Sequence, residues 1–358
     1  MKINHDRLIE TFISLVKIDS ESGEEKEIIN YLQSMMIDLG FDAEIDKTGN
    51  LVCSNDSNPR LMLAAHTDTV TPGKGIKPII DGNIIKTDGT TILGSDDKAN
   101  VAIILEILQV LKKNDIHAPL NVVFTIGEEV GFTGSTGLDY EKIGAKIGLN
   151  LDGEIGEIDI AEPSMMVFDI EITGKAAHSG MAPEKGINAL KIAAEAINSL
   201  DLGRIDEETT VNVGTIRGGE AVNIIPEKIA LKAEVRSRSN EKFNYQVQKL
   251  IDVFEKTAKK YGGLFKITSE QTSYAFNVTE DDKLVEVLKN CFTKNGVKPE
   301  VLKINAGSDT SNFSRNNIKC VTTGGCGKDY HTTGEYLEID GFTKAAASIL
   351  DAILELTK

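Results

Sequence analysis

The stretch Leu61-Met62-Leu63-Ala64-Ala65-His66-Thr67-Asp68 decides the fold class of this chain. Its first five residues form a continuous apolar run, which is typical of a strand buried on both faces of a sheet. A histidine and an aspartate follow at the carboxyl end of that strand. Because ligands of open α/β sheets bind at the carboxyl ends of the strands, the stretch predicts both a buried strand and part of a site.

Further strand and helix signals surround this run. Apolar runs typical of strands recur at 120–126 and 147–151, and a helical pattern covers 98–112. The stretch Ser22-Gly23-Glu24-Glu25 is typical of a capping box at the start of a helix, and Gly40 marks the end of that helix. Buried strands that alternate with helices predict an α/β domain with a partly parallel sheet.

The pattern changes near residue 164. Six elements then follow one another in the order strand, helix, strand, strand, helix, strand, at 166–172, 187–200, 209–216, 228–236, 243–261 and 264–272. This β-α-β-β-α-β order is that of a ferredoxin-like unit. Because helical patterns of the first type resume afterwards, we expect a discontinuous core domain, 1–163 and 276–358, with an inserted α+β domain, 164–275.

Composition and charge exclude several classes of function. The 358 residues contain 41% hydrophobic and 26% charged residues, which is ordinary for a globular protein and argues against disorder. The net charge of -16 argues against binding to nucleic acid or to an anionic membrane surface. The start of the chain lacks a signal-peptide pattern, and the longest apolar stretch, Val101 to Leu111, is too short to span a membrane.

The cysteines indicate a reducing compartment. The chain has 4 cysteines, which are too few for a disulfide scaffold at this length, and no Cys-x-x-Cys pair. We therefore expect core cysteines in a cytoplasmic protein, with no nucleic-acid or membrane partner.

Acidic residues and one histidine gather at the predicted strand ends. They lie in four segments, as His66 and Asp68, Asp96 and Asp97, Glu128 and Glu129, and Asp152. Packed together without a cation, these carboxylates would repel one another. A pair of divalent metal ions resolves the repulsion, and mixed histidine and carboxylate ligands suit Zn²⁺. A single acid at a strand end is more often a helix cap or loop residue, so the prediction rests on the four segments together.

Four motifs resemble those of a known family. They are His66-Thr67-Asp68-Thr69-Val70, Gly94-Ser95-Asp96-Asp97-Lys98-Ala99, Gly127-Glu128-Glu129-Val130-Gly131 and Asn150-Leu151-Asp152-Gly153. Their order and spacing resemble the M20 metallopeptidases over essentially the whole chain. The Asp-Asp-Lys sequence of the second motif is more similar to the peptidase T (tripeptide aminopeptidase) branch than to the deacylases and carboxypeptidases. The resemblance implies a zinc-peptidase-like mixed sheet with helices on both faces, an inserted lid or dimerisation domain, and a homodimer.

The resemblance also implies a role for each residue of the core. His66, Asp96 and Asp152 would bind one zinc, and Asp96 would bridge to a second zinc that Glu129 and His331 complete. His331 lies in Asp329-Tyr330-His331-Thr332-Thr333-Gly334-Glu335, and only the family resemblance identifies it. Glu128 would be the general base, and Asp68 would hydrogen-bond the ring of His66.

Further roles fall to the inserted domain and to one loop. His178, in Gly174-Lys175-Ala176-Ala177-His178-Ser179-Gly180, resembles a family histidine that stabilises the oxyanion, often in the partner subunit's site. Asn223 and Arg236 resemble residues that hold the substrate's carbonyl and carboxylate, and Gly307 and Ser308 resemble a loop that lines the substrate pocket. Without the resemblance, Asn223 could equally be a turn former and Arg236 a surface residue. Arg238 lies on the same strand face, so the sequence leaves open whether Arg236 or Arg238 contacts the substrate.

The implied function is zinc-dependent hydrolysis of short peptides, with release of the N-terminal residue of tripeptides by a metal-activated water and a glutamate base. Co²⁺ or Mn²⁺ could substitute for zinc. A dizinc deacylase or amidohydrolase of N-acyl amino acids, including a desuccinylase, stays open because identical metal ligands serve both reactions. A non-catalytic metal-binding homologue is a third reading, against which the complete ligand set counts.

Overall fold

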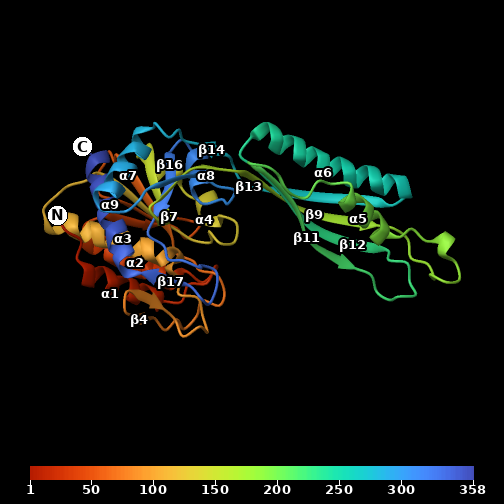
Figure 1. Ribbon diagram of the computed structural model, residues 1–358, viewed down its shortest axis with the longest axis horizontal. Helices are drawn as coiled ribbons and strands as arrows, with labels where there is room; N and C mark the ends of the chain where they lie inside the picture. The colour runs from red at the N-terminus through yellow and green to blue at the C-terminus, as the bar shows by residue number, and fades with distance from the viewer. The chain divides into compact units, whose positions relative to one another are not determined.

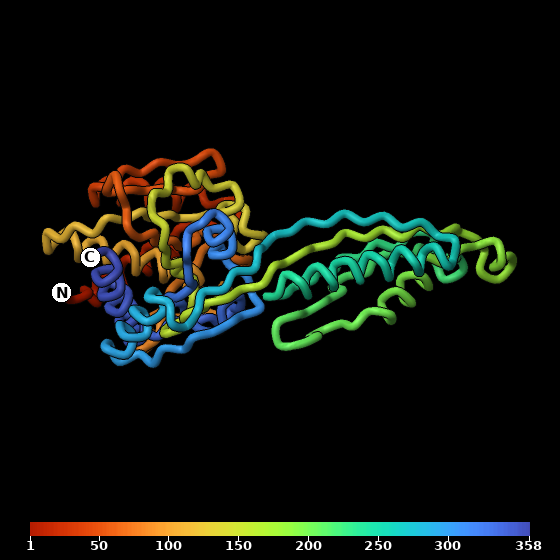
Figure 2. The backbone as a smooth tube through the Cα atoms, turned by 90° about the horizontal axis from the view of Figure 1, so that it is seen from above, coloured from red at the N-terminus to blue at the C-terminus, as the bar shows by residue number.

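The computed structural model describes residues 1–358, which form two compact units (Figure 1). The core unit comprises Met1–Ala161, Asn277–Lys303 and Ser308–Lys358, and it contains both ends of the chain (Figure 2). The inserted unit comprises Glu162–Phe276 and the short segment Ile304–Gly307. That segment was not expected in the inserted unit.

The core unit is built on a nine-stranded mixed sheet in the order β1-β2-β6-β3-β7-β16-β8-β14, with β15 paired to β8. The strands are β1 Asp42–Ile45, β2 Leu51–Ser54, β3 Leu61–His66, β6 Leu120–Thr125, β7 Ile147–Ile155, β8 Glu157–Glu162, β14 Phe276–Asn277, β15 Glu300–Lys303 and β16 Lys319–Gly324. Strand β3 runs parallel to both of its neighbours, β6 and β7. All of its residues are buried, so the apolar run predicted the central strand correctly.

Helices cover both faces of this sheet, as the resemblance implied. They are α1 His5–Val16, α2 Lys26–Leu39, α3 Ser95–Lys113, α4 Thr133–Thr136, α7 Lys283–Lys294, α8 Thr310–Arg315 and α9 Ile339–Leu356. Helices α1, α3 and α9 pack on one another, and α3 lies against β3 and β7. Met62 and Ala64 of β3 pack in a separate apolar cluster with Phe313 of α8. A small sheet of β4 (Ile79–Asp81), β5 (Ile84–Lys86) and β17 (Tyr336–Glu338) completes the core unit.

The predicted capping box before α2 is wrong. Glu25 is the N-cap residue, and no side chain caps the helix. Instead, the Ser22 hydroxyl donates to the Asp68 carboxylate at 2.7 Å, and the Glu25 carboxylate accepts the backbone N–H of Gly127 at 3.0 Å. These polar side chains stabilise the loops at the carboxyl edge of the sheet, which satisfies buried groups that a local cap would leave unpaired.

The inserted unit has the predicted ferredoxin-like order with one additional edge strand. Its antiparallel sheet has the order β10-β11-β12-β9-β13, with β9 Ser164–Thr173, β10 Gly203–Asp206, β11 Thr209–Gly218, β12 Lys228–Ser237 and β13 Leu264–Ser273. Helices α5 (Ala189–Asn198) and α6 (Asn240–Tyr261) pack against the sheet over a core that includes Phe168, Leu231 and Phe254.

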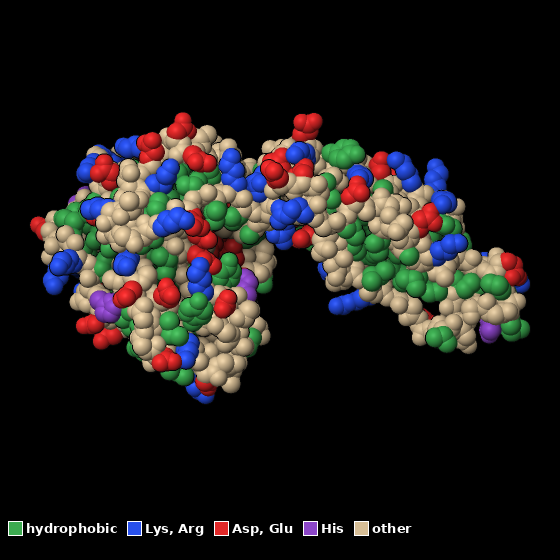
Figure 3. All heavy atoms as spheres, in the orientation of Figure 1, with side chains coloured by type: hydrophobic (Ala, Val, Ile, Leu, Met, Phe, Trp, Pro, Cys, Tyr) green, Lys and Arg blue, Asp and Glu red, His purple; other side chains and the backbone are tan.

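Surface and cysteine features agree with the composition. No helix combines the length and the apolar character that a membrane span needs. All four cysteines are free and buried. The face of the molecule in Figure 3 has acidic and basic side chains interspersed rather than gathered in one basic patch.

Candidate metal centre

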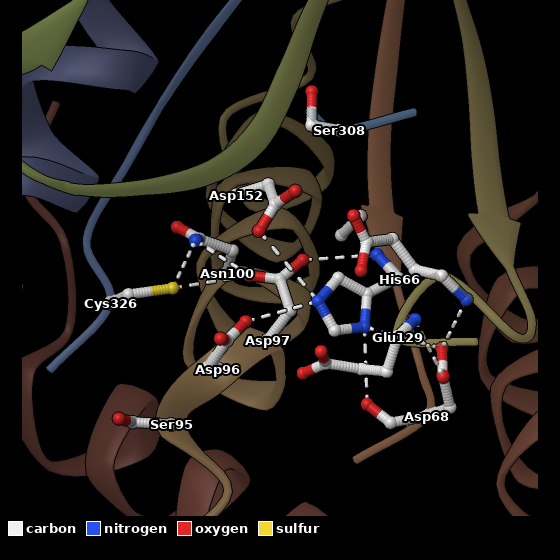
Figure 4. Close-up of polar contacts among 12 residues, drawn as sticks. His66, Asp68, Ser95, Asp96, Asp97, Asn100, Glu129, Asp152, Ser308 and Cys326 are labelled. Carbon is white, nitrogen blue, oxygen red and sulfur yellow. Dashed lines mark hydrogen bonds and ion pairs between the residues drawn. The ribbon is translucent and has the colours of Figure 1, made fainter. Parts of the chain in front are cut away.

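Three neighbouring strands and one helix bring the predicted residues together at the carboxyl edge of the core sheet (Figure 4). His66 is the last residue of β3, Asp152 lies in β7, and Glu129 follows β6. Asp96 lies in the first turn of α3, where its backbone is not helical (φ -83°, ψ 102°). The parallel pairing of β3 with β6 and β7 therefore places side chains from distant parts of the sequence around one point.

The turn after β6 directs two consecutive acids into the site. Gly127 has φ 57°, a left-handed conformation that favours glycine, and a Cβ there would lie 2.1 Å from a Thr133 oxygen. The backbone N–H groups of Glu128 and Glu129 both donate to the Asp68 carboxylate, at 3.0 and 3.2 Å. Because a turn replaces the alternation of a strand here, neighbouring side chains can serve the same site.

Two overlapping ligand groups share Asp96. The first ligand group is His66, Asp96 and Asp152, and the second ligand group is Asp96, Glu129 and His331, with the ligand atoms of each group within 4.8 Å of one another. Asp96 Oδ1 lies 3.0 Å from His66 Nε2, and Asp96 Oδ2 lies 3.2 Å from His331 Nε2. The remaining contacts are His66 Nε2 to Asp152 Oδ1, 3.7 Å, and His331 Nε2 to Glu129 Oε1, 2.8 Å. One oxygen of Asp96 thus faces each group, which is the arrangement of a bridging carboxylate.

The ring of His66 is oriented by its own strand end. Its Nδ1 lies 3.1 Å from the main-chain oxygen of Asp68 and 3.4 Å from Oδ1 of the same residue. These contacts leave Nε2 directed at Asp96 and Asp152, as metal-binding histidines require. The closest contacts of the Asp68 carboxylate are with Ser22 and with the turn after β6, so Asp68 organises that turn as well as the ring.

The electrostatics of the site indicate uncompensated negative charge. Burial raises the pKa of Glu128 and of Asp152 well above the usual range, and neighbouring carboxylates add to the effect. Burial opposes ionisation of Asp96 too, but hydrogen bonds from His331 and His66 hold its pKa below the usual range. Contacts with Asp96 and Glu129 raise the pKa of His331 to about 10. Two nitrogen donors and several buried carboxylates therefore fit a pair of divalent cations, of which zinc accepts such mixed ligands.

Sequence reasoning gave no role to the side chains that hold Asp97. Asp97 Oδ2 accepts a hydrogen bond from the backbone N–H of His66 at 3.0 Å. Asp97 Oδ1 accepts one from Asn100 Nδ2 at 2.7 Å and one from the Cys326 thiol at 3.3 Å. Both oxygens of Asp97 are therefore engaged in supporting the first ligand group (Figure 4). Only the adjacency of Asp97 to Asp96 could have suggested this from the sequence.

His178 and Asn223 lie beside each other in the inserted unit. His178 Nδ1 accepts the backbone N–H groups of Gly180 and Met181, both at 3.2 Å, and the backbone N–H of Ser179 donates to the Asn223 carbonyl at 3.0 Å. A neutral His178 ring with this acceptor carries its proton on Nε2. The residue is thus prepared to donate a hydrogen bond.

Arg236 lies at the other end of the same sheet. It pairs with Met165 near the start of β9, whereas His178 follows the end of that strand at Thr173. At about 3.3 Å per residue, Met165 and Thr173 are roughly 26 Å apart. One copy of the inserted unit therefore does not bring Arg236 and His178 together.

Arg236 and Arg238 both hold the segment Ile304–Gly307. Arg236 donates to the Asn305 carbonyl at 3.2 Å, and Arg238 donates to the Ile304 carbonyl at 3.2 Å. These contacts explain why the segment belongs to the inserted unit. Arg236 also pairs with the Glu234 carboxylate at 2.9 Å, and its buried Nε has no hydrogen-bond partner.

The loop residues Gly307 and Ser308 differ in exposure. Gly307 is half-buried, whereas the Ser308 side chain is buried with its hydroxyl 3.1 Å from that of Thr322. The Ser308 hydroxyl also accepts the backbone N–H of Thr310 at 3.2 Å. The hydroxyl is therefore part of the core, and substrate contact at Gly307 and Ser308 stays a prediction.

Two family profiles match parts of the chain. The M20 peptidase dimerisation domain matches residues 160–262, and peptidase family M28 matches residues 49–193. The first match lies over the inserted unit. The second includes four of the five residues of the two ligand groups, all except His331.

Several known proteins are similar to the chain over its full length. Aminopeptidase PepT from Bacillus cereus ATCC 10987 is 39% identical, with 99% of this chain and 100% of that chain covered and a TM-score of 0.92. A tripeptidase from Staphylococcus aureus is 36% identical, with both chains covered to 100% and a TM-score of 0.96. The protein YqjE of Bacillus subtilis strain 168 is 38% identical, with 99% and 100% covered.

Proposed function

Because the chain belongs to the M20 metallopeptidases, in their peptidase T-like branch, we propose that it removes the N-terminal residue of short peptides with two bound zinc ions. The observation that carries this proposal is the position of Asp96, whose two oxygens face the imidazoles of two different ligand groups. A carboxylate in this position serves two cations at once and offsets their mutual repulsion.

The ligand assignment follows the two groups. His66, Asp96 and Asp152 would hold one ion, and Asp96, Glu129 and His331 would hold the other. Bound ions would polarise the scissile carbonyl and lower the pKa of the attacking water.

Glu128 is the general base of this mechanism. Its carboxylate belongs to a cluster with His66 and Glu129 whose polar atoms lie within 4.8 Å of one another, although it belongs to neither ligand group. Glu128 takes the proton of the attacking water on its carboxylate and then delivers it to the nitrogen of the leaving amine. Burial favours the neutral form that exists between these transfers, while Asp68 holds the backbone of Glu128 through its N–H.

The inserted unit would contribute the remaining substrate contacts. The buried, unpartnered Nε of Arg236 suits a substrate carboxylate, and the Nε2 of His178 suits the oxyanion. A fully extended tripeptide spans at most about 11 Å, less than half of the roughly 26 Å between the two strand ends. We therefore propose a homodimer in which His178 of one subunit serves the site of the other.

A complementation experiment tests the composite site. Glu128→Gln and His178→Ala subunits, each inactive alone, should regain part of the activity after mixing, because one site of the heterodimer then has both residues. His178→Ala should keep both metal ions. No recovery after confirmed subunit exchange, or full activity of a strict monomer, would contradict the composite site.

A substrate panel tests the reaction itself. Metal-free protein reconstituted with Zn²⁺ or Co²⁺ should cleave tripeptides faster than dipeptides and should leave N-acyl amino acids intact, with the free N-terminal residue as product. A chelated sample provides the control and should be inactive. Preferential hydrolysis of N-acyl amino acids would replace the peptidase by the deacylase, and metal binding without any hydrolysis would indicate the non-catalytic homologue.

A further inference from the structure

The carboxylate of Glu335 is buried against the amino end of helix α3, 242 residues from Leu93 in the sequence. Its side chain is 1% exposed. It accepts five hydrogen bonds, from the backbone N–H groups of Leu93 (2.7 Å), Gly94 (2.8 Å), Ser95 (2.7 Å) and Asp96 (3.3 Å) and from the Ser95 hydroxyl (2.5 Å). No residue of the proposed mechanism explains why a buried acid lies here.

The amino end of α3 is built to receive a carboxylate. Gly94 has φ 72°, and the following N–H groups at the start of this 19-residue helix have no partner within the helix. The positive end of the helix dipole favours a negative charge at the same point. A glutamine at position 335 would turn an amide N–H₂ towards these donors, so the glutamate is specific.

Glu335 belongs to the same loop as His331. The backbones of Lys328 and Tyr336 close this loop with two hydrogen bonds, at 2.8 and 3.1 Å. Asp329 and His331 have φ values of 56° and 62°, in the left-handed region that few non-glycine residues adopt, although Asp and His do so more often than most. Such a conformation persists only where the surroundings hold it, so the loop needs an anchor.

Glu335 joins the start of α3, which carries Asp96, to the loop that carries His331, and the loop depends on it more. Asp96 has a second support, because the adjacent Asp97 accepts hydrogen bonds from the His66 backbone and from Asn100. His331 is half-exposed, and apart from its own contact with Asp96 at 3.2 Å, the neighbouring backbone of Gly327 donates to the Ser95 hydroxyl of this segment at 3.2 Å. Loss of Glu335 should therefore displace His331 more than Asp96.

We propose that Glu335 is a positioning residue that fixes His331 against Asp96 and so assembles the second ligand group. This inference rests on the proposed two-metal function. It predicts an effect on one of the two metal ions, because Glu335 supports His331 but none of the residues that are exclusive to the first ligand group.

Cobalt titration of the metal-free protein tests the proposal. Wild-type protein should bind two Co²⁺ per chain, and Glu335→Gln should bind one of them about 10–100-fold more weakly, the usual effect of removing a residue that supports a ligand. Turnover number should fall at limiting Co²⁺ and recover at high Co²⁺, with little change in KM. Glu338→Gln is the matched control, because Glu338 is exposed and makes no side-chain hydrogen bond.

A purely structural role would give another result. Glu335→Gln would then lower the melting temperature of the metal-free protein and leave both Co²⁺ affinities unchanged, which overturns the proposal. If that variant does not fold, Ser95→Ala removes the 2.5 Å hydroxyl contact with Glu335 and the 3.2 Å contact from Gly327. It should weaken the same ion by a smaller factor, and unchanged affinity there would also overturn the proposal. A wild-type protein that binds fewer than two Co²⁺ would refute the proposed function itself.

Discussion

Replacement of Glu128 by glutamine separates proton transfer from metal binding. Glutamine has nearly the same shape, and the backbone N–H of residue 128 keeps its 3.0 Å hydrogen bond to Asp68. The amide cannot accept the proton of the attacking water, so the general-base contribution disappears. Contributions of this kind are about 10²–10⁴-fold in rate, which corresponds to roughly 2.7–5.4 kcal/mol of transition-state stabilisation.

The metal content of this variant should not fall. Glu128 belongs to neither ligand group, and burial together with the neighbouring acids raises its pKa well above the usual range. Because the site already opposes a charge at this position, a neutral side chain should leave the free energy of unfolding of the metal-free protein unchanged or higher.

Glu129→Gln provides the matched control for this experiment. It makes the same chemical change one residue along, at a side chain whose Oε1 lies 2.8 Å from His331. We expect Glu128→Gln to keep both ions and lose turnover, and Glu129→Gln to lose one ion. The assays are turnover of a tripeptide at saturating metal and elemental analysis after dialysis. Near-normal turnover in Glu128→Gln, or loss of metal from that variant and not from Glu129→Gln, would refute the assignment of the two acids.

Two further substitutions test the ligand bridge and the stability of the core unit. Asp96→Ala should remove both metal ions, whereas His66→Ala should weaken the binding of one, because the two oxygens of Asp96 face separate ligand groups. Equal metal stoichiometry in the two purified variants would exclude the bridge. Arg7→Ala should lower the free energy of unfolding by about 3 kcal/mol, because it leaves the fully buried Glu106 carboxylate without the 2.6 Å contact of its partner. Urea denaturation of the metal-free protein measures this effect, and a change below about 1 kcal/mol would show that solvent replaces the arginine.

The sequence was sufficient for the part of the site that follows from strand geometry. An apolar run as short as residues 61–65 is typical of a buried strand, and parallel strands present their carboxyl ends at one edge. Residues at or just beyond the ends of such strands, including His66 and Glu129, therefore meet without any specific long-range signal. The same logic identified Asp152, although the structure extends its strand to Ile155.

Local signals failed where distant partners compete for the same side chain. Ser22 and Glu25 have the spacing of a capping box, but the Ser22 hydroxyl donates to Asp68, 46 residues away. The Glu25 carboxylate accepts from Gly127, 102 residues away, as well as from the nearby Gly23. A hydrogen bond that satisfies a buried carboxylate or a buried backbone N–H contributes more to stability than one at an exposed helix end, because the buried group has no water to replace it. The spacing of polar residues thus identifies groups that need partners, without identifying the partners.

His331 shows a second limit. Its loop has left-handed residues at Asp329 and His331, where the sequence offers no glycine to indicate the conformation. Its contact with Glu129 spans 202 residues, so no strand or helix period relates the two. The family resemblance supplied the histidine, but the anchor that holds it, Glu335, is visible only from the hydrogen bonds at the start of α3.

The strand pairing of the inserted sheet limits how His178 and Arg236 can act on one substrate. The resemblance gives His178 and Arg236 to one substrate, and each has a polar atom suited to its part. The pairing of Arg236 with Met165, however, puts the arginine at the opposite end of β9 from the histidine. If both residues act on the same tripeptide, two copies of the inserted unit must contribute to each site. Dimerisation would then be a condition for catalysis, because a lone subunit would lack either the oxyanion donor or the carboxylate contact at every site.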